Sequence, residues 1–252
     1  MRRLAPFALL AFASLAHADP PRVLVTWPPE WPIDPAPVTS ESWPRLPVIE
    51  EGSPATSTSA IIVATLRRIQ ATQRDAAYQH RRDVNERALR YRWDCSGMVS
   101  WVVAHTSPRA ARALGGDRVI ARRVFDTILR APTARPRRGW QRLLHIEDAR
   151  PGDVFAWRTP RGSPSPHSGH TGFVLSRPAR VEGLRDAYAI RIADSVVGPH
   201  EDDTRPEDTP GSLGFVVMVF LTDGRGRATH FGWHGTRTAG YWRTPVAFGR
   251  LD

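Results

Sequence analysis

The sequence has 252 residues, of which 41% are hydrophobic, so its length and composition fit one globular domain with appendages and exclude a wholly disordered chain. Its single cysteine excludes a disulfide framework within the chain. The formal net charge of +10 comes from scattered arginines without any lysine. Because no nucleic-acid-binding motif accompanies these arginines, we expect no nucleic-acid partner.

Residues 1–18 have the three parts of a secretory signal peptide. Arg2 and Arg3 give a positive start, residues 4–15 form a short apolar stretch, and residues 16–18 read Ala-His-Ala, a small-x-small cleavage pattern. The apolar stretch is too short to span a bilayer, and no later segment is long enough. We therefore expect a mature chain that starts at Asp19, is periplasmic or secreted, has no transmembrane segment and is a monomer.

Residues 19–55 are rich in proline, and Trp27, Trp31 and Trp43 each stand directly before a proline. These prolines exclude a regular helix or a central strand. The segment is predicted to be an extended tether, with a peptide ligand for another protein as the alternative. The folded domain is then expected to cover residues 56–252.

The domain is predicted to begin with a helix at Ser57, capped by Ser57 or Ser59. Its apolar residues recur at helical spacing, although Gln73 interrupts the stripe. Since no proline ends it, this helix is expected to run to about Leu89. The apolar residues on its face are Ile62, Leu66, Ile69 and Ala76.

Two further helices are predicted, one from Cys95 to just before Pro108 and one over residues 119–129. After Pro151 the pattern changes to short apolar runs separated by glycine and proline, which is typical of strands. Helices followed by strands indicate an α+β fold rather than a parallel α/β sheet. The predicted strands cover residues 153–157, 171–175, 187–193, 215–221 and 228–233.

Cys95 carries the clearest chemical signal. An unpaired thiol is unusual in an exported protein because it oxidises, and the alternative is a small buried apolar residue. Asp94, Ser96 and Gly97 surround it, and an apolar helix starts there. The dipole and the unpaired N–H groups of a helix N-terminus stabilise a thiolate. We interpret Cys95 as a nucleophile.

A thiolate nucleophile requires a base, and His170 is the candidate. It opens a predicted strand, with Gly169 and Gly172 on either side allowing another backbone or a substrate to approach closely. The following strand ends in Asp194, and a carboxylate beside an imidazole fixes its tautomer and stabilises its charged form. His200 is the alternative orienting residue.

Three blocks of sequence resemble the NlpC-type cell-wall cysteine peptidases, which have a papain-like fold. They read Asp-Cys-Ser-Gly-Met-Val from Asp94, Pro-Gly-Asp-Val-Phe from Pro151 and Gly-His-Thr-Gly-Phe-Val from Gly169. The resemblance covers approximately residues 91–195 and implies a cysteine helix packed on an antiparallel sheet. It implies Cys95 as nucleophile and His170 as base, while Asp194 stands where the family often has histidine.

The same resemblance implies an exported hydrolase that cleaves amide bonds in the peptide stems of peptidoglycan. Asp94 and Ser96 are then expected to contact the free amino end of the substrate. The tyrosine–glycine pair that the family often carries before its cysteine is not present in its usual form. Tyr91 and Trp93 are expected to substitute for it in substrate binding, or Tyr78 on the preceding helix.

Three other clusters of polar or aromatic residues are predicted to have structural roles. The histidines and carboxylates near His200 match no standard ligand spacing, so we expect no metal and no organic cofactor. Residues 202–205 are predicted to be a charged loop satisfied within itself. Trp233, Tyr241 and Trp242 are predicted to pack in the core or at its rim, with a sugar-binding platform as the alternative.

Two other functions remain open at this stage. One is a non-catalytic envelope module that binds a peptide or polymer in the same cleft. The other is an acyl transferase or transpeptidase, which differs from a hydrolase only in the nucleophile that reaches the acyl-enzyme.

Overall fold

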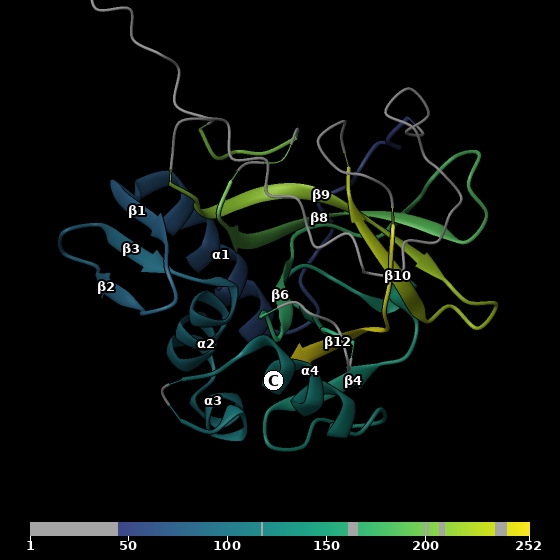
Figure 1. Cartoon of the computed structure of the whole chain (residues 1–252). Helices are drawn as coiled ribbons and strands as arrows, with labels where there is room; N and C mark the ends of the chain where they lie inside the picture. Colours follow the sequence, from purple (N-terminus) through teal and green to yellow (C-terminus); the bar gives the residue numbers. More distant parts are fainter. Residues whose placement is uncertain are drawn as a thin grey trace, which may run out of the picture.

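The computed structural model describes residues 45–116, 118–160, 166–198, 200, 202–206, 210–234 and 241–252. The predicted signal peptide and the predicted tether up to residue 44 lie outside these ranges. The described residues form an α+β fold of four α-helices, a small three-stranded sheet and a larger antiparallel sheet. The small sheet and helices α1, α2 and α3 lie on the left in Figure 1, α4 lies below beside β12 and β4, and the larger sheet extends from the centre to the right.

The helices are α1 (Ser57–Thr72), α2 (Cys95–Thr106), α3 (Pro108–Leu114) and α4 (Ala121–Arg130), with a short 3-10 helix at Ile146–Asp148. The small sheet has the order β1-β3-β2 and consists of β1 (Asp75–Tyr78), β2 (Asp83–Asn85) and β3 (Arg90–Trp93). The larger sheet has the order β11-β10-β9-β8-β6-β5-β12-β4, and β7 pairs with β8 beside that path. Its strands are β4 (Trp140–Leu143), β5 (Val154–Arg158), β6 (Gly169–Val174), β7 (Ala179–Arg180), β8 (Ala187–Val196), β9 (Ser212–Thr222), β10 (Ala228–Trp233), β11 (Trp242–Arg243) and β12 (Val246–Leu251).

The larger sheet curves strongly onto itself. Three strands separate β5 from β10 in the sheet order, yet the rings of Trp157 and Phe231 on these strands stack with centroids 3.6 Å apart. An aromatic-rich core fills the inside of the curve, and Trp233 and Trp242 belong to it. Tyr241 is also buried, in the separate cluster that includes Val217 and Val219, so the prediction that these three aromatic residues pack in the core is confirmed.

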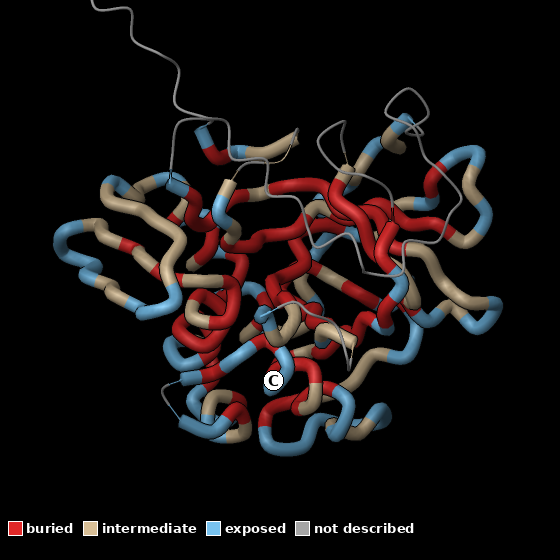
Figure 2. The backbone as a smooth tube through the Cα atoms, in the orientation of Figure 1, coloured by how far each residue is buried: buried red, intermediate tan, exposed pale blue. Residues whose placement is uncertain are grey.

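The other face of the sheet is covered by the helices. Ile62 and Leu66 of α1, Met98 and Val102 of α2 and Phe173 of β6 are all buried in one apolar cluster. Burial runs almost continuously through α2, β6, β8 and β9, while exposed residues are concentrated in the connections (Figure 2). Helix α2 is therefore held firmly against the strand that carries His170.

The helix predicted to run from Ser57 to Leu89 is too long by more than a dozen residues. Helix α1 ends at Thr72, and the chain then forms β1, β2 and β3. After Gln73 the sequence is mostly polar, so a continued helix would have no apolar face to bury. The N-cap was also misassigned, because the side chain of Thr56 accepts the hydrogen bond from the Ser59 N–H.

The other predicted elements are found within a few residues of their expected bounds. Helix α2 and strands β5, β6, β8, β9 and β10 correspond to predicted segments. Several elements were missed: Pro108 was read as a helix end but begins α3, residues 246–251 form the inner strand β12, and β4, β7, β11 and the 3-10 helix were not predicted either. Proline suits the first turn of a helix because its missing N–H would be unpaired there.

The end of the predicted tether contacts the domain. Leu46 and Ile49 pack against the buried cluster that includes Val181 and Val217. The carbonyl of Glu50 accepts a hydrogen bond of 3.1 Å from the N–H of Arg177. Leu46, Ile49 and Glu50 therefore lie against the sheet side of the domain, while Glu51 forms an ion pair with Arg67 of α1.

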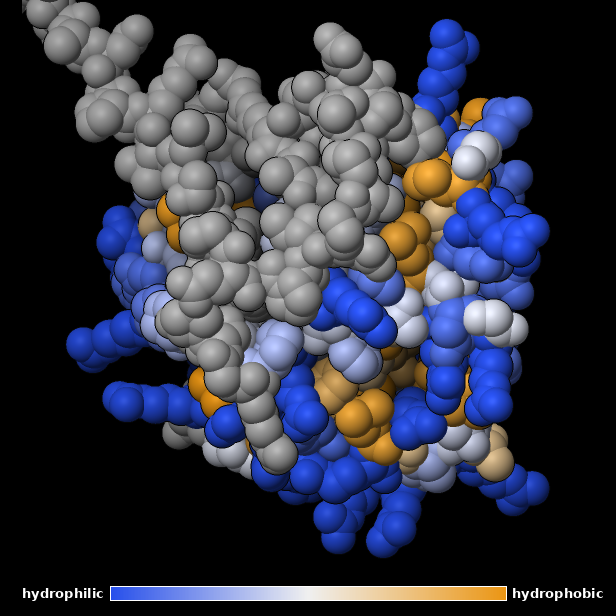
Figure 3. All heavy atoms as spheres, turned by 45° about the vertical axis from the view of Figure 1, so that its right-hand side comes forward, coloured by the Kyte–Doolittle hydropathy of each residue, from blue (hydrophilic) through white to orange (hydrophobic). Residues whose placement is uncertain are grey.

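Hydrophilic side chains dominate the part of the surface that Figure 3 shows outside its grey atoms, and the apolar side chains there form small separate patches. Exposed large apolar residues such as Ile120 and Leu144 are 42% and 40% exposed. Within the described ranges, no helix has both the length and the apolar character needed to cross a membrane.

Candidate active site

Cys95 is the first residue of α2, and its position is set by the cap of that helix. The Asp94 carboxylate accepts hydrogen bonds from the Gly97 N–H at 2.6 Å and from the Ser96 hydroxyl at 2.9 Å. Aspartate is a favoured N-cap because it satisfies an N–H that has no partner within the helix. The Cys95 N–H belongs to the same unpaired first turn. The thiol is free and 7% exposed.

His170 lies on β6, where two glycines let neighbouring strands come close. A Cβ atom on Gly169 would lie 2.0 Å from the Trp157 carbonyl oxygen, and one on Gly172 would lie 2.4 Å from the Ala193 carbonyl oxygen. The expected close approach is therefore made by the backbones of β5 and β8. The His170 side chain is buried among aromatic rings, and the centroids of the His170 and Trp157 rings lie 5.0 Å apart.

Asp194 lies within β8 rather than at its end, since the strand continues to Val196. Strands β6 and β8 are antiparallel with Val174 opposite Ile192, so even-numbered residues of both strands share a face. His170 and Asp194 therefore point to the same side. The Nε2 atom of His170 lies 3.0 Å from Oδ2 of Asp194, and the Asp194 side chain is completely buried.

Cys95 and His170 are also in contact. Burial acts to lower the pKa of His170, but the charge of Cys95, the hydrogen bonds with Asp194 and Cys95 and the charge of Asp194 raise it to about 9. Because Nε2 is bound to Asp194, Nδ1 is the ring nitrogen that remains for the thiol. The structure thus brings together the three residues that the sequence selected.

The Asp194 carboxylate has further partners that the sequence analysis missed. Arg205 donates to Oδ1 from Nη1 at 3.1 Å and from Nη2 at 2.7 Å, and the Trp233 ring N–H lies 3.4 Å from Oδ2. Burial raises the pKa of Asp194, but the positive charges of Arg205 and His170 and the His170 hydrogen bond lower it below its ordinary value. Asp194 is therefore held as a carboxylate.

The prediction of a self-satisfied charged loop at residues 202–205 is only partly right. Asp203 and Arg205 do form an ion pair, with Nη2 and Oδ2 separated by 2.8 Å. The same guanidinium also reaches Asp194 in β8. The loop is thus joined to the candidate site, and no local sequence pattern marks this connection.

Tyr78 lies at the end of β1 and is half-buried. Burial raises its pKa, and the nearby charges of Cys95, Asp94 and Asp194 raise it further. Its backbone N–H donates to the Pro210 carbonyl at 3.1 Å. The prediction that Tyr78 lies on a helix is wrong, because it lies on strand β1. Its phenol nevertheless lies near the charged groups of Cys95, Asp94 and Asp194.

The prediction that Tyr91 and Trp93 bind substrate is wrong. Both side chains are completely buried in the core between the helices and the sheet, where their rings lie 5.3 Å apart and each packs near the ring of Trp101. Ser96 is only 4% exposed, and its hydroxyl is donated to Asp94. Ser96 therefore supports the helix cap and is not open to a substrate.

The remaining oxygen of Asp94 contacts an exposed side chain. Oδ2 lies 3.2 Å from Nδ1 of His80, whose side chain is 70% exposed. Since Oδ1 is used by the helix cap, Oδ2 is the atom that can meet an incoming amine. Asp94 thus remains a candidate for substrate contact.

His200, the alternative orienting residue, has a different position. The His200 ring stacks on the Trp233 ring with centroids 4.6 Å apart, and the backbone N–H of His200 donates a hydrogen bond to Oδ2 of Asp203 at 2.9 Å. His200 contributes positive charge near Asp194, while the Nε2 atom of His170 is bound to Asp194 itself. This geometry favours Asp194 for orienting the imidazole.

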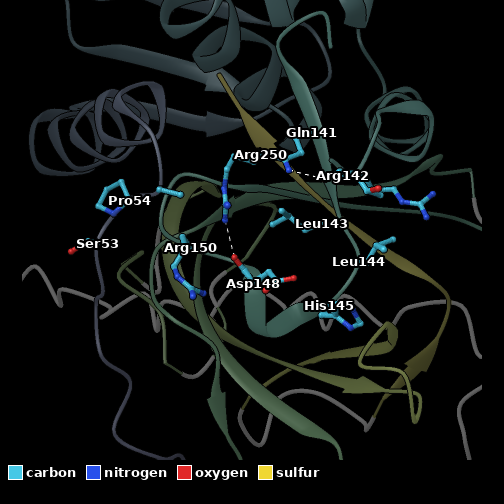
Figure 4. Close-up of a pocket in the computed structure, with 12 residues that line it drawn as sticks. Ser53, Pro54, Gln141, Arg142, Leu143, Leu144, His145, Asp148, Arg150 and Arg250 are labelled. Atoms are coloured by element: carbon cyan, nitrogen blue, oxygen red, sulfur yellow. Dashed lines mark hydrogen bonds between the residues drawn. The ribbon is translucent and has the colours of Figure 1, made fainter. Parts of the chain in front are cut away.

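A cavity of about 490 Å³ lies away from these residues (Figure 4). Arg142 and Arg150 donate to backbone carbonyls, and Arg250 donates to the carboxylate of Asp153. Because these guanidinium groups are already bound, we assign no ligand to the cavity. Among the residues that the structure describes, no group of three or more histidine, cysteine, aspartate or glutamate side chains is arranged to hold a metal ion.

Comparisons with models of protein families, with curated proteins and with solved structures find no match to this chain. The resemblance to the NlpC-type peptidases therefore rests on its three sequence blocks. What the structure adds is geometric: an α+β fold in which a cysteine at a helix start, a histidine and a carboxylate meet from three separate elements.

Proposed function

We propose that this chain is an exported cysteine amidase or peptidase with a papain-like NlpC-type fold, which cleaves amide bonds in the peptide stems of peptidoglycan. One observation carries the catalytic part: the contacts run from the thiol of Cys95 to His170, and from His170 to the buried carboxylate of Asp194. Nucleophile, base and orienting group in hydrogen-bonded series are the arrangement of covalent acyl transfer. The substrate class is taken from the sequence resemblance.

In the first half of the reaction, Nδ1 of His170 accepts the proton of the Cys95 thiol. The thiolate then attacks the amide carbonyl carbon, and the developing oxyanion accepts a hydrogen bond from the Cys95 N–H at the start of α2. When the carbon–nitrogen bond breaks, protonated His170 gives its proton to the leaving amine. A thioester between Cys95 and the acyl part of the substrate remains.

In the second half, His170 accepts a proton from water, and the resulting hydroxide attacks the thioester carbonyl. The carbon–sulfur bond breaks, and the thiolate of Cys95 leaves while His170 is protonated. Asp194 holds Nε2–H throughout and stabilises the positive imidazolium. The raised pKa of His170, about 9, supports its role as the base that takes the proton of the Cys95 thiol.

Asp94 is proposed to recognise the free amino end of the peptide stem. Its Oδ2 atom is the oxygen that does not cap the helix, and it lies one residue from the nucleophile. An ammonium group at this position would form a charge-assisted hydrogen bond in place of the His80 contact. This would favour cleavage near an unblocked N-terminus.

The test is to incubate the full chain with purified muropeptides and to analyse the products by mass spectrometry. We expect the wild type to release fragments cleaved at an amide bond, and Cys95→Ala and His170→Ala to release none. His145→Ala is the matched control, because His145 is an exposed histidine on the distant cavity, and it should cleave like the wild type.

Full cleavage by Cys95→Ala would contradict the proposal. Products joined by a new amide bond, formed only by the wild type, would indicate transfer to an amine in place of hydrolysis. Binding of muropeptides without any Cys95-dependent product would instead support a non-catalytic envelope module.

A further inference from the structure

Arg205 is a buried cation that the proposed reaction does not use directly. It lies in the connection between β8 and β9, and its side chain is 1% exposed. Its guanidinium binds the carboxylates of Asp194 and Asp203, whose side chains are 0% and 1% exposed. It also donates to the backbone carbonyl of Ser212 at 2.9 Å. A buried charge is tolerated only when it is paired in this way.

The two oxygens of Asp194 have separate partners. Oδ1 accepts two hydrogen bonds from Arg205, and Oδ2 lies 3.0 Å from Nε2 of His170. This fork of two donors holds Oδ1 in place by two charge-assisted hydrogen bonds. The contact of Oδ1 with Arg205 therefore determines where Oδ2 points.

The neighbouring strand leaves room for this guanidinium. Gly214 of β9 pairs directly with Asp194, and a Cβ atom at Gly214 would lie 2.6 Å from both Cγ and Nε of Arg205. Asp203 lies against the same glycine, with Oδ1 2.6 Å from that Cβ atom, and its Oδ2 accepts a hydrogen bond from Nε of Arg205 at 3.0 Å. Glycine, arginine and both carboxylates thus form one interlocking arrangement behind His170.

We propose that Arg205 is a positioning residue of the candidate active site: it keeps Asp194 ionised and oriented toward His170, and so extends to lower pH the range in which Cys95 is a reactive thiolate. This inference rests on the proposed catalytic pair of Cys95 and His170. Arg205 acts through Asp194 and does not touch the substrate.

The electrostatic sign follows from the groups that face Asp194 and His170. Removal of the Arg205 charge raises the proton affinity of Asp194, because a nearby cation is what favours its ionised form. A protonated Asp194 no longer stabilises the imidazolium, and the imidazolium no longer stabilises the thiolate. Besides Asp194 and His170 themselves, several titratable and charged groups face them. These are Asp94 and Cys95 at the start of α2, Tyr78 on β1, and His200, Asp203 and Arg205 between β8 and β9.

The experiment measures how fast iodoacetamide alkylates the full chain as a function of pH, and it reports on Cys95 alone because the chain has one cysteine. Arg205→Gln keeps a hydrogen-bond donor but removes the charge, and Arg205→Lys keeps the charge but loses the fork. Arg191→Gln is the matched control, since Arg191 lies on β8 and pairs with Asp202 on the same loop at the surface. Circular dichroism first establishes that each variant is folded.

We expect the midpoint of the alkylation profile to rise by about 1–3 pH units in Arg205→Gln. Arg205→Lys should raise it by less, and Arg191→Gln should leave it at the wild-type value. Midpoints of the Arg205 variants equal to that of Arg191→Gln would overturn the inference, even if their maximal rates were lower. If Arg205→Gln does not fold, the midpoint of Arg205→Lys is compared with that of Arg191→Gln, and equal midpoints would again overturn the inference.

A double variant tests whether Arg205 acts through Asp194. In Asp194→Asn the carboxylate that Arg205 would ionise is absent, so adding Arg205→Gln should change the midpoint by much less than it does in the wild type. An equal shift in both backgrounds would overturn the assignment. These measurements need no substrate: a slowly alkylated wild-type thiol with an ordinary midpoint would contradict the proposed function, whereas a reactive wild type with unshifted Arg205 variants contradicts only the role of Arg205.

Discussion

Nε2 of His170 lies 3.0 Å from Oδ2 of Asp194. Asparagine at position 194 keeps the shape of the side chain but loses the charge that fixes the tautomer of the imidazole. We expect Asp194→Asn to fold and to lower kcat/KM by about 10²–10⁴-fold. Asp194→Ala should lose more activity and about 3–5 kcal/mol of unfolding free energy, because it leaves Arg205 buried without this partner. Muropeptide kinetics and urea denaturation measure the two effects.

His200→Ala serves as the comparison for the Asp194 variants. Since His200 stacks on Trp233 and is not bound to Nε2 of His170, we expect kcat/KM within a few-fold of the wild type. Near-normal turnover in Asp194→Ala together with a severe loss in His200→Ala would give the orienting role to His200.

The pH profile of the wild type should reflect the protonation of His170. Its pKa in the folded protein is about 9, above the ordinary value of 6.5, so the protonated form persists at neutral pH. We expect kcat/KM to fall as the pH rises through about 9. The contribution of His170 to the free energy of unfolding should be fully present below about 6.5 and should also be lost as the pH rises through about 9.

Both profiles can be recorded on the same preparation, the first with muropeptides and the second by urea denaturation across the pH range. His145→Ala should show the same descending limb as the wild type. A descending limb near pH 6.5 would mean that the imidazole is not stabilised in its charged form.

Substitutions of Asp94 should separate its structural role from substrate recognition. Asp94→Ala removes the N-cap of α2 and should cost about 0.5–2 kcal/mol of unfolding free energy. Asp94→Asn retains the cap but loses the charge, so we expect nearly wild-type stability and a raised KM. This increase should occur for peptides with a free amino end and not for the same peptides after N-acetylation. Equal KM changes for both peptides would argue against recognition of the amine by Asp94.

Gly172→Ala should destabilise the pairing of β6 with β8, because the new methyl group would lie 2.4 Å from the Ala193 carbonyl oxygen. Overpacking of this kind costs about 1–3 kcal/mol. Gly224→Ala is the control, since nothing lies within 4 Å of a Cβ atom there and the residue does not have a positive φ. Thermal unfolding of the two variants compares them directly, and equal midpoints would show that β8 can move away without cost.

The helix that begins at Cys95 and the strands of His170 and Asp194 could be predicted because their signals are local. A polar cap followed by an apolar run indicates a helix start, and short apolar runs between glycines indicate strands. Residues 74–93 could not be predicted in this way. Tyr91 and Trp93 are buried because α1, α2 and the large sheet cover β3, which is a tertiary effect that no local pattern encodes.

The contact of Arg205 with Asp194 could not be predicted from the sequence for a similar reason. It depends on the register between β8 and β9, which sets Gly214 opposite Asp194 and leaves space for the guanidinium. From sequence alone, Asp203 offered an adjacent and sufficient partner for Arg205. The burial of all three charged side chains becomes evident only when the strands are paired.

The hydroxyl of Thr56 donates to the carbonyl of Leu251 at 2.8 Å, which joins the cap of α1 to a residue 195 positions later. Strand β12, which carries Leu251, lies between β5 and β4. During synthesis, β5 and β4 therefore cannot pair with β12 until residue 251 has been added. Because a domain generally folds as a unit, helix α2 is made early but gains its complete support only when β12 has joined the sheet. The first helix and the last strand are thus joined, so loss of β12 would loosen α1 as well as the two strands on either side of β12.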